Sequence, residues 1–119
     1  MKTLKNICNE KGEEIYMTRK EFQEFIAKGK MILDGATGSN LQKRGMPTGV
    51  CPEEWILEHP DVLVGLQREY IEAGSDVLYA PTFSGNRIKL EEYGLADQIG
   101  EMNRKLAGLS FEAIRQADT

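Results

Sequence analysis

The chain has 119 residues, with 15 Lys+Arg against 19 Asp+Glu, which gives a net charge of −4. A hydrophobic content of 40% excludes wholesale disorder, and the length suits one small domain or part of a larger one. The acidic balance excludes a basic nucleic-acid surface, and no apolar run approaches the roughly 20 residues that cross a bilayer. Because the first residues form no apolar signal core, we predict a cytoplasmic protein with Cys8 and Cys51 reduced.

The N-terminal part divides into an irregular arm and a short helix. Residues 1–17 are mostly polar and show little periodicity, so we expect a leader without regular structure. Thr18 and Glu21 form a capping box, which predicts a helix over residues 19–28 that ends at Gly29. Its apolar face, which includes Phe22, is expected to pack on something larger.

Two short apolar runs, residues 31–33 and 76–80, are typical of strands buried on both faces. Helical patterns alternate with them and cover residues 40–44, 52–57, 60–73, 87–92 and 97–117. This alternation predicts an α/β fold, in which helices cover a parallel sheet. Two strands leave unpaired edges, so we predict the opening piece of a larger domain or a unit that must associate.

A glycine-rich turn, residues 34–39, follows the first predicted strand. Ligands of α/β folds gather where strands end, and Gly35 and Gly38 would give the turn conformational freedom and close approach to a ligand. Successive backbone N–H groups can hold a carboxylate, and Asp34 can accept hydrogen bonds from an ammonium group. The turn therefore suits an amino acid. Two alternatives stay open: Asp34 only caps the turn, or the turn binds phosphate, although it lacks a Gly-Lys-Ser/Thr ending.

The loop after the second predicted strand carries Thr82, which can form hydrogen bonds, and Phe83, which can wall a pocket. Ordinary loop chemistry is the alternative. Glu53 follows a proline at a predicted helix start, where the helix dipole already favours a carboxylate. Trp55 is expected in the core. No nucleophile–base pair follows from the spacing, so we name no catalytic residue, and the two cysteines with His59 are too few for a four-ligand zinc site.

Three stretches in this order and spacing resemble the homocysteine S-methyltransferase family. They are Met31 to Leu41, Val50 to Pro60, and Glu69 to Leu95 with its Thr82-Phe83 pair. The resemblance implies a (β/α)8 TIM barrel, which needs about 250 residues. This chain would supply its first two strand–helix units, incomplete by itself, with residues 18–119 as the N-terminal part of a homocysteine-binding domain.

The resemblance also implies a function, the transfer of a methyl group to a zinc-bound homocysteine thiolate to give methionine. The residues that correspond to the family's amino-acid pocket are Asp34, Gly35, Ala36, Ser39 and Thr82. The family's zinc cysteines lie on later strands and match no segment here, so we expect zinc only in the complete domain. Cobalamin or folate would be the methyl source in a larger protein.

Ala80-Pro81 stands where many members of the family carry Thr-Asn, which removes a side-chain amide and a backbone donor. Whether this chain is an enzyme by itself is left open. The partners expected are homocysteine and either the remaining barrel segments or a partner chain. The alternatives are a non-catalytic α/β binding or assembly module that needs a partner chain, and another α/β enzyme with a phosphate loop.

Overall fold

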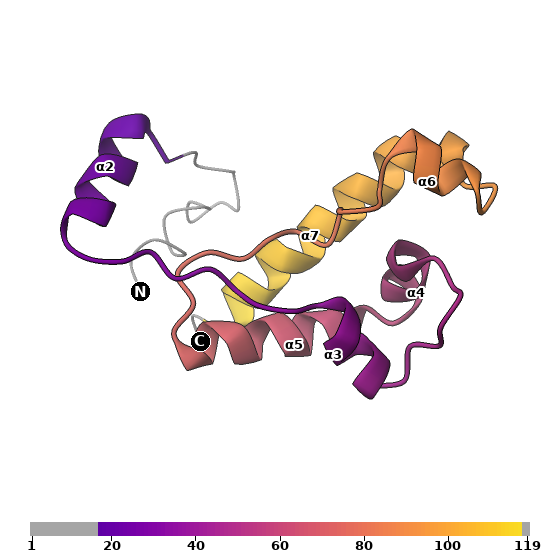
Figure 1. Ribbon diagram of the computed structural model, residues 1–119, viewed down its shortest axis with the longest axis horizontal. Coiled ribbons are helices and arrows are strands. Elements are labelled where there is room, and N and C mark those ends of the chain that lie inside the picture. The colour runs from indigo at the N-terminus through magenta and orange to yellow at the C-terminus, as the bar shows by residue number, and fades with distance from the viewer. Residues whose placement is uncertain (1–16, 118–119) are drawn as a thin grey trace.

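A computed structural model of the chain describes residues 17–117 (Figure 1). The predicted irregular arm, residues 1–17, lies outside the described residues except for Met17. The helices in chain order are α2 (Arg19–Ala27), α3 (Gly38–Lys43), α4 (Pro52–Glu58), α5 (Pro60–Ala73), α6 (Arg87–Glu91), the short 3-10 helix η1 (Ala96–Gln98) and α7 (Ile99–Ala117). The predicted helices are therefore all present, with bounds that shift by a few residues.

Helix α2 begins as the capping box predicts. The Thr18 side chain accepts a hydrogen bond from the Glu21 backbone N–H at 3.1 Å. The packing expectation is not met, because no residue of α2 is buried within the described part of the chain and Phe22 is 43% exposed. Figure 1 shows α2 standing away from the other helices, at the end of an extended segment.

Helices α4 and α5 have clear start and stop signals in the sequence. Each begins with a proline at its first position, where the missing N–H would have no partner within the helix. Helix α5 ends at Gly74, whose φ of 117° lies in the left-handed region that glycine adopts without steric cost. These signals fix the starts of both helices and the end of α5 locally, before any tertiary packing is considered.

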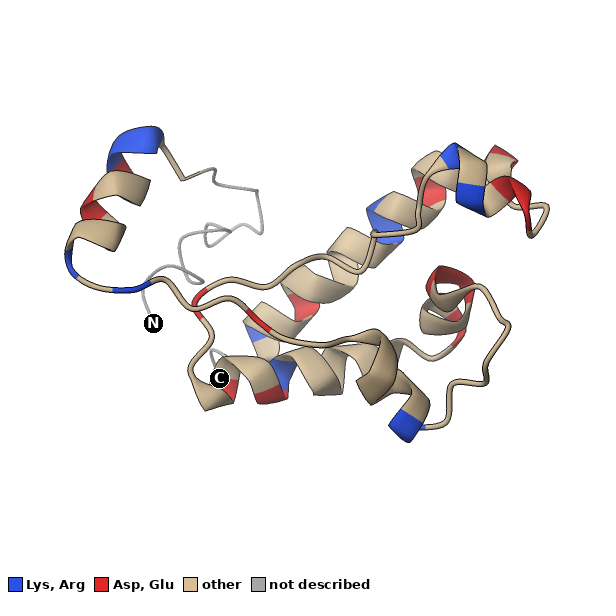
Figure 2. Ribbon diagram, in the orientation of Figure 1, with Lys and Arg blue, Asp and Glu red and all other residues tan. Residues whose placement is uncertain are grey.

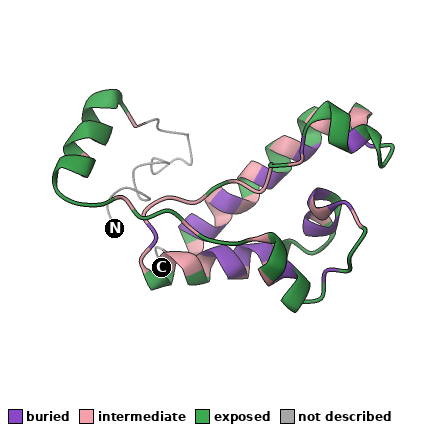
Figure 3. Ribbon diagram, viewed as in Figure 1, coloured by how far each residue is buried: buried purple, intermediate pink, exposed green. Residues whose placement is uncertain are grey.

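The core lies between helices. Helix α7 runs at an angle to α5 and packs against it, α4 contacts both helices, and α3 contacts α5 (Figure 1). Buried residues recur along these helices, as the purple segments of Figure 3 show. The main apolar cluster consists of Leu41, Met46, Trp55, Ile56, Leu63, Leu66 and Leu106. Trp55 is therefore a core residue, as predicted.

The fold-class prediction is wrong. The residues described form helices and a single isolated parallel bridge, Leu33 to Val77, and no sheet. The two predicted strands are extended segments that run side by side (Figure 1). They are held by the bridge and by backbone bonds such as Asp34 N–H to the Val77 carbonyl, at 3.0 Å. The first two strand–helix units of a TIM barrel are therefore not what the described chain forms.

The exposure of the two segments gives the physical reason. Ile32 is 54% exposed and Leu33 is 46% exposed, so the apolar run that predicts a doubly buried strand is not covered on both faces. A parallel ladder needs neighbours on both edges and cover on both faces, and two short segments supply neither. The apolar pattern indicates which residues tolerate burial, but a sheet forms only where neighbouring strands pair with one another.

The outer faces of the helices are charged. Figure 2 shows Lys or Arg and Asp or Glu interspersed along α6 and α7. Exposed ion pairs connect neighbouring turns, such as Lys105 to Glu101 at 3.0 Å, and such pairs contribute at most about 1 kcal/mol each. None of the helices between residues 17 and 117 combines the length and apolar character that crossing a bilayer requires.

Candidate functional site

The glycine-rich turn and the second loop lie next to each other. The Asp34 carboxylate accepts a hydrogen bond from the Tyr79 backbone N–H at 3.2 Å. On the second segment, the Asp76 carboxylate accepts a hydrogen bond from the Ile32 N–H of the first segment at 2.9 Å. The two carboxylates thus join the two extended segments in both directions. This pairing brings the two predicted site loops together, although no sheet forms.

Asp34 is a partly buried carboxylate. Desolvation by burial raises the pKa of the Asp34 carboxyl above its ordinary value of 3.8, and the hydrogen bond from Tyr79 offsets part of that rise. Among residues 17–117, no Lys, Arg or His nitrogen forms an ion pair with Asp34. A cationic ligand group beside it would therefore supply the charge that the protein does not.

The turn itself is held by Tyr70 of α5. The Tyr70 hydroxyl donates to the Ala36 carbonyl at 2.7 Å and accepts from the Asn40 side-chain amide at 3.1 Å. The same Asn40 amide donates to the Ala36 carbonyl at 2.8 Å. This triangle fixes the turn relative to α3 and α5, and no feature of the local sequence predicted it.

Of the two reasons predicted for Gly35 and Gly38, the need for an unusual backbone conformation is wrong. Neither Gly35 nor Gly38 has a positive φ, so neither adopts a conformation that other residues avoid. Gly35 is required for another reason, because a Cβ there would lie 2.9 Å from the Tyr70 hydroxyl. A Cβ at Gly38 would meet nothing within 4 Å.

Replacing Gly35 with alanine is expected to lower the free energy of unfolding by about 1–2 kcal/mol, because Tyr70 must move and weaken its hydrogen bonds. Gly38→Ala is the matched control and should be neutral or slightly stabilising. The measurement is urea unfolding. In a Tyr70→Phe background, which removes the hydroxyl, the Gly35→Ala cost should shrink; an unchanged cost would show that the contact is not its cause.

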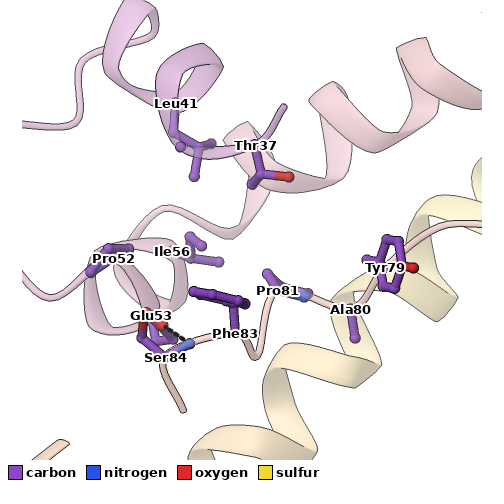
Figure 4. Close-up of a pocket in the computed structure, with 11 residues that line it drawn as sticks. Thr37, Leu41, Pro52, Glu53, Ile56, Tyr79, Ala80, Pro81, Phe83 and Ser84 are labelled. Carbon is purple, nitrogen blue, oxygen red and sulfur yellow. Dashed lines mark hydrogen bonds between the residues drawn. The ribbon is translucent and has the colours of Figure 1, made fainter. Parts of the chain in front are cut away.

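A cavity of about 230 Å³ lies beside this turn (Figure 4). Its walls come from the start of α3, from α4 and from the second loop, and are mostly apolar. The lining residues are Thr37, Gly38, Leu41, Pro52, Glu53, Ile56, Tyr79, Ala80, Pro81, Phe83 and Ser84. Phe83 is among the lining residues and is 97% exposed, so it borders the open side of the cavity.

None of the five predicted pocket residues is among those that line this cavity, although each lies within a few positions of a lining residue in the sequence. Asp34, Gly35 and Ala36 precede the lining residues of the turn, and Ser39 follows them on the exposed side of α3. Thr82 lies between two lining residues, and its N–H donates to the Ala80 carbonyl at 2.8 Å. The structure therefore brings the two predicted loops to one cavity, and neighbours of the predicted residues form its surface.

Glu53 is the carboxylate that the sequence predicts at a helix start. It lies in the first turn of α4 and is only 3% exposed. One carboxylate oxygen, Oε1, accepts the Ser84 backbone N–H at 2.9 Å (Figure 4). The other, Oε2, has no hydrogen-bond partner within the described residues. The sequence could not reveal this contact, because its two partners are 31 positions apart.

Comparison with known proteins decides the family. The profile of the homocysteine S-methyltransferase family matches residues 31–119, about three quarters of the chain. The chain belongs to the homocysteine S-methyltransferase family. The match includes both loops of the cavity and all four helices that form the core, so this family describes the part of the chain in which the candidate site lies.

Relatives at 34–36% identity support the homocysteine S-methyltransferase assignment. A methionine synthase from Mycobacterium leprae is 34% identical over 90 residues, 69% of this chain and 7% of that protein. A betaine–homocysteine S-methyltransferase from Bos taurus is 36% identical over 78 residues, 64% of this chain and 19% of that protein. An S-methylmethionine–homocysteine S-methyltransferase from Pongo abelii is 34% identical over 70 residues, which are 57% of this chain and 19% of that protein. The chain therefore spans less than a fifth of the length of each.

The zinc that the homocysteine S-methyltransferase resemblance implies has no fitting ligand set between residues 17 and 117, where no three His, Cys, Asp or Glu side chains gather. Cys51 is buried in a second apolar cluster with Leu90, Leu95 and Met102, away from solvent. Cys8 lies outside the described residues. We therefore assign no zinc-dependent step to this part of the chain.

Proposed function

We propose that this chain supplies part of the amino-acid pocket of a homocysteine S-methyltransferase, an enzyme that methylates the homocysteine thiol to give methionine. The observation that carries the proposal is the meeting of the family-matched turn and second loop at one apolar cavity. A thiol-bearing chain of a few carbons suits such walls, while its charged end needs polar groups at the edge.

The turn offers groups for both charges of an amino acid. Asp34 is a partly desolvated carboxylate, without a cationic partner in the described chain, and suits the ammonium group. The backbone N–H groups of Gly35 and Ala36 have no acceptor in the described part of the chain, and they suit the carboxylate. Ser39 and Thr82 add hydroxyl groups next to lining residues of the turn and of the second loop in the sequence.

The proposal for these residues concerns amino-acid binding and includes neither the methyl donor nor the activation of the thiol. The printed names of the relatives include betaine and S-methylmethionine as donors, and those donors are properties of those proteins. Zinc would supply thiol activation in a complete family domain, with cobalamin or folate as methyl source in a larger protein. In this proposal the described residues bind and orient the amino acid, and no three of their His, Cys, Asp or Glu side chains gather as a metal site.

A binding or assembly module that needs a partner chain is the second candidate, and one observation favours it. Large apolar side chains remain exposed along the two extended segments and beyond them, at Ile32, Leu33, Tyr79, Phe83 and Ile88. Exposed apolar groups that lie near one another are typical of surfaces that another segment covers. Such a module would take part in association without binding homocysteine by itself.

Calorimetry on the full 119-residue chain tests the proposal. Homocysteine should bind with a dissociation constant of about 1 mM or lower, which corresponds to about −4 kcal/mol, because the pocket groups are present before binding. A nucleoside triphosphate is the control and should give no binding heat. Binding of the nucleotide instead would favour the phosphate loop, and heat from neither ligand would favour the assembly module.

A further inference from the structure

Gln67 is a polar residue on the buried face of α5. It is 1% exposed, and the other buried residues of this helix are Leu63, Val64 and Leu66. Its Nε2 donates to the Tyr79 carbonyl at 2.9 Å, while its Oε1 has no hydrogen-bond partner among residues 17–117. A buried amide with an unsatisfied oxygen costs free energy that an aliphatic side chain would not. The bond to Tyr79 is therefore what a glutamine contributes at this position.

The backbone of Tyr79 is held by two side chains and not by a neighbouring strand. Among residues 17–117, neither its N–H nor its carbonyl bonds to another backbone group. The N–H donates to the Asp34 carboxylate at 3.2 Å, and the carbonyl accepts from the Gln67 amide. Because this N–H and this carbonyl belong to the two peptide groups that flank Tyr79, the two bonds together restrict its φ and ψ.

The segment held in this way forms part of the cavity wall. Tyr79, Ala80 and Pro81 are successive residues of the lining, and Figure 4 shows them along one stretch of chain. A rotation of the peptide group after Tyr79 would move this wall and would also turn the N–H that faces Asp34. Gln67 is not among the lining residues, so it can affect the cavity only through the backbone that it holds.

We propose that Gln67 is a positioning residue for the amino-acid pocket. From the core, it fixes the orientation of the Tyr79 backbone, and thereby both the hydrogen bond to Asp34 and the cavity wall that follows Tyr79. The inference rests on the proposed function, since the pocket is the one that takes homocysteine. Gln67 itself touches no ligand atom.

The test compares Gln67→Met with Leu66→Met in the full chain. Methionine is close to glutamine in length and flexibility but has no N–H donor, so it removes the bond to Tyr79 and keeps the side chain buried. Leu66 is the preceding residue of α5 and is buried in the main apolar cluster, so its exchange controls for a changed core side chain. Gln67→Leu is a second variant without the donor, and far-UV circular dichroism checks that each variant folds.

The first measurement needs no ligand. It is a carbon-13 NMR titration of the Asp34 carboxyl, assigned as the signal that is missing from Asp34→Asn. Burial raises the pKa of this carboxyl, and the backbone N–H groups of Tyr79 and of Asp34 itself lower it. Loosening Tyr79 should therefore move the midpoint to higher pH in both Gln67 variants and leave Leu66→Met at the wild-type value. The same midpoint in all four chains would overturn the proposal, because a merely structural role lowers stability without moving it.

The second measurement is calorimetry with homocysteine at pH 7. The wild type and Leu66→Met should bind equally, and both Gln67 variants should bind about threefold to tenfold more weakly. Unchanged binding in the Gln67 variants would overturn the proposal and leave the proposed function standing. Absence of binding to the wild type would overturn the proposed function, and the Asp34 midpoints would still decide whether Gln67 positions that carboxylate's partner.

Discussion

Replacing Leu106 with alanine is expected to lower the free energy of unfolding by about 2–5 kcal/mol. Leu106 is fully buried and is the residue through which α7 enters the main apolar cluster formed by α3, α4 and α5. Truncation removes three carbon atoms that pack in the buried core, and it leaves a cavity that the neighbouring side chains fill only in part. Because small domains are stable by only about 5–15 kcal/mol, this single change should remove a large share of the stability.

Leu109→Ala on the same helix is the matched control. Leu109 packs against the same cluster but is only partly buried, so its truncation should cost about 1–2 kcal/mol. Urea unfolding followed by far-UV circular dichroism measures both variants. A cost below about 1 kcal/mol for Leu106→Ala would contradict the crossing of α5 and α7 as the basis of the core.

Helix ends are the part of this fold that the sequence predicted well. The Thr18 cap, the prolines that open α4 and α5, and Gly74 at the end of α5 all act through backbone groups within a few residues. Their energetics are decided locally, so no knowledge of the tertiary structure is needed. The apolar spacing of α7 was equally readable, because Met102, Leu106 and Ala113 face the core together.

The strands were mispredicted because their signal is not local. An apolar run such as Ile32-Leu33 states a preference for burial, but a strand exists only when a neighbour pairs with it. Within residues 17–117 the pairing amounts to the one bridge between Leu33 and Val77. The two segments still lie side by side, so the prediction that their loops share a site does not depend on a sheet.

The candidate site shows the same division between local and long-range effects. The residue types at the turn suggested an amino-acid site. The space for a side chain at position 35, however, is limited by the hydroxyl of Tyr70, which lies 35 positions later in the sequence. The Glu53 contact with Ser84 also joins distant residues. Each of these is a tertiary contact between residues that are unremarkable in isolation, so the sequence alone carried no signal for them.

Replacing Asp34 with asparagine is expected to weaken homocysteine binding by about 1–3 kcal/mol, which is the scale of a lost charged hydrogen bond. Asparagine keeps an oxygen for the Tyr79 N–H, so the link between the two extended segments should persist. Asp76→Asn is the matched control, because Asp76 makes the same kind of bond across the same segments, to the Ile32 N–H. Calorimetry on the full chain should show weakening in Asp34→Asn alone; an unchanged dissociation constant would remove Asp34 from the pocket.

The pH dependence follows from the direction of the Asp34 shift. Burial raises the pKa of the Asp34 carboxyl above 3.8, so the folded chain binds this proton more tightly than the unfolded chain does. The free energy of unfolding should therefore fall as the pH rises from 3.8 through the raised pKa, and Asp34→Asn should flatten that slope. An ammonium ligand favours the ionised carboxylate, so homocysteine binding should weaken as the pH falls through the same window. Urea unfolding of the wild type and Asp34→Asn at several acid pH values checks the first sign. Titrating both chains with homocysteine over the same pH values checks the second, and a parallel response of the two chains would contradict an ammonium contact at Asp34.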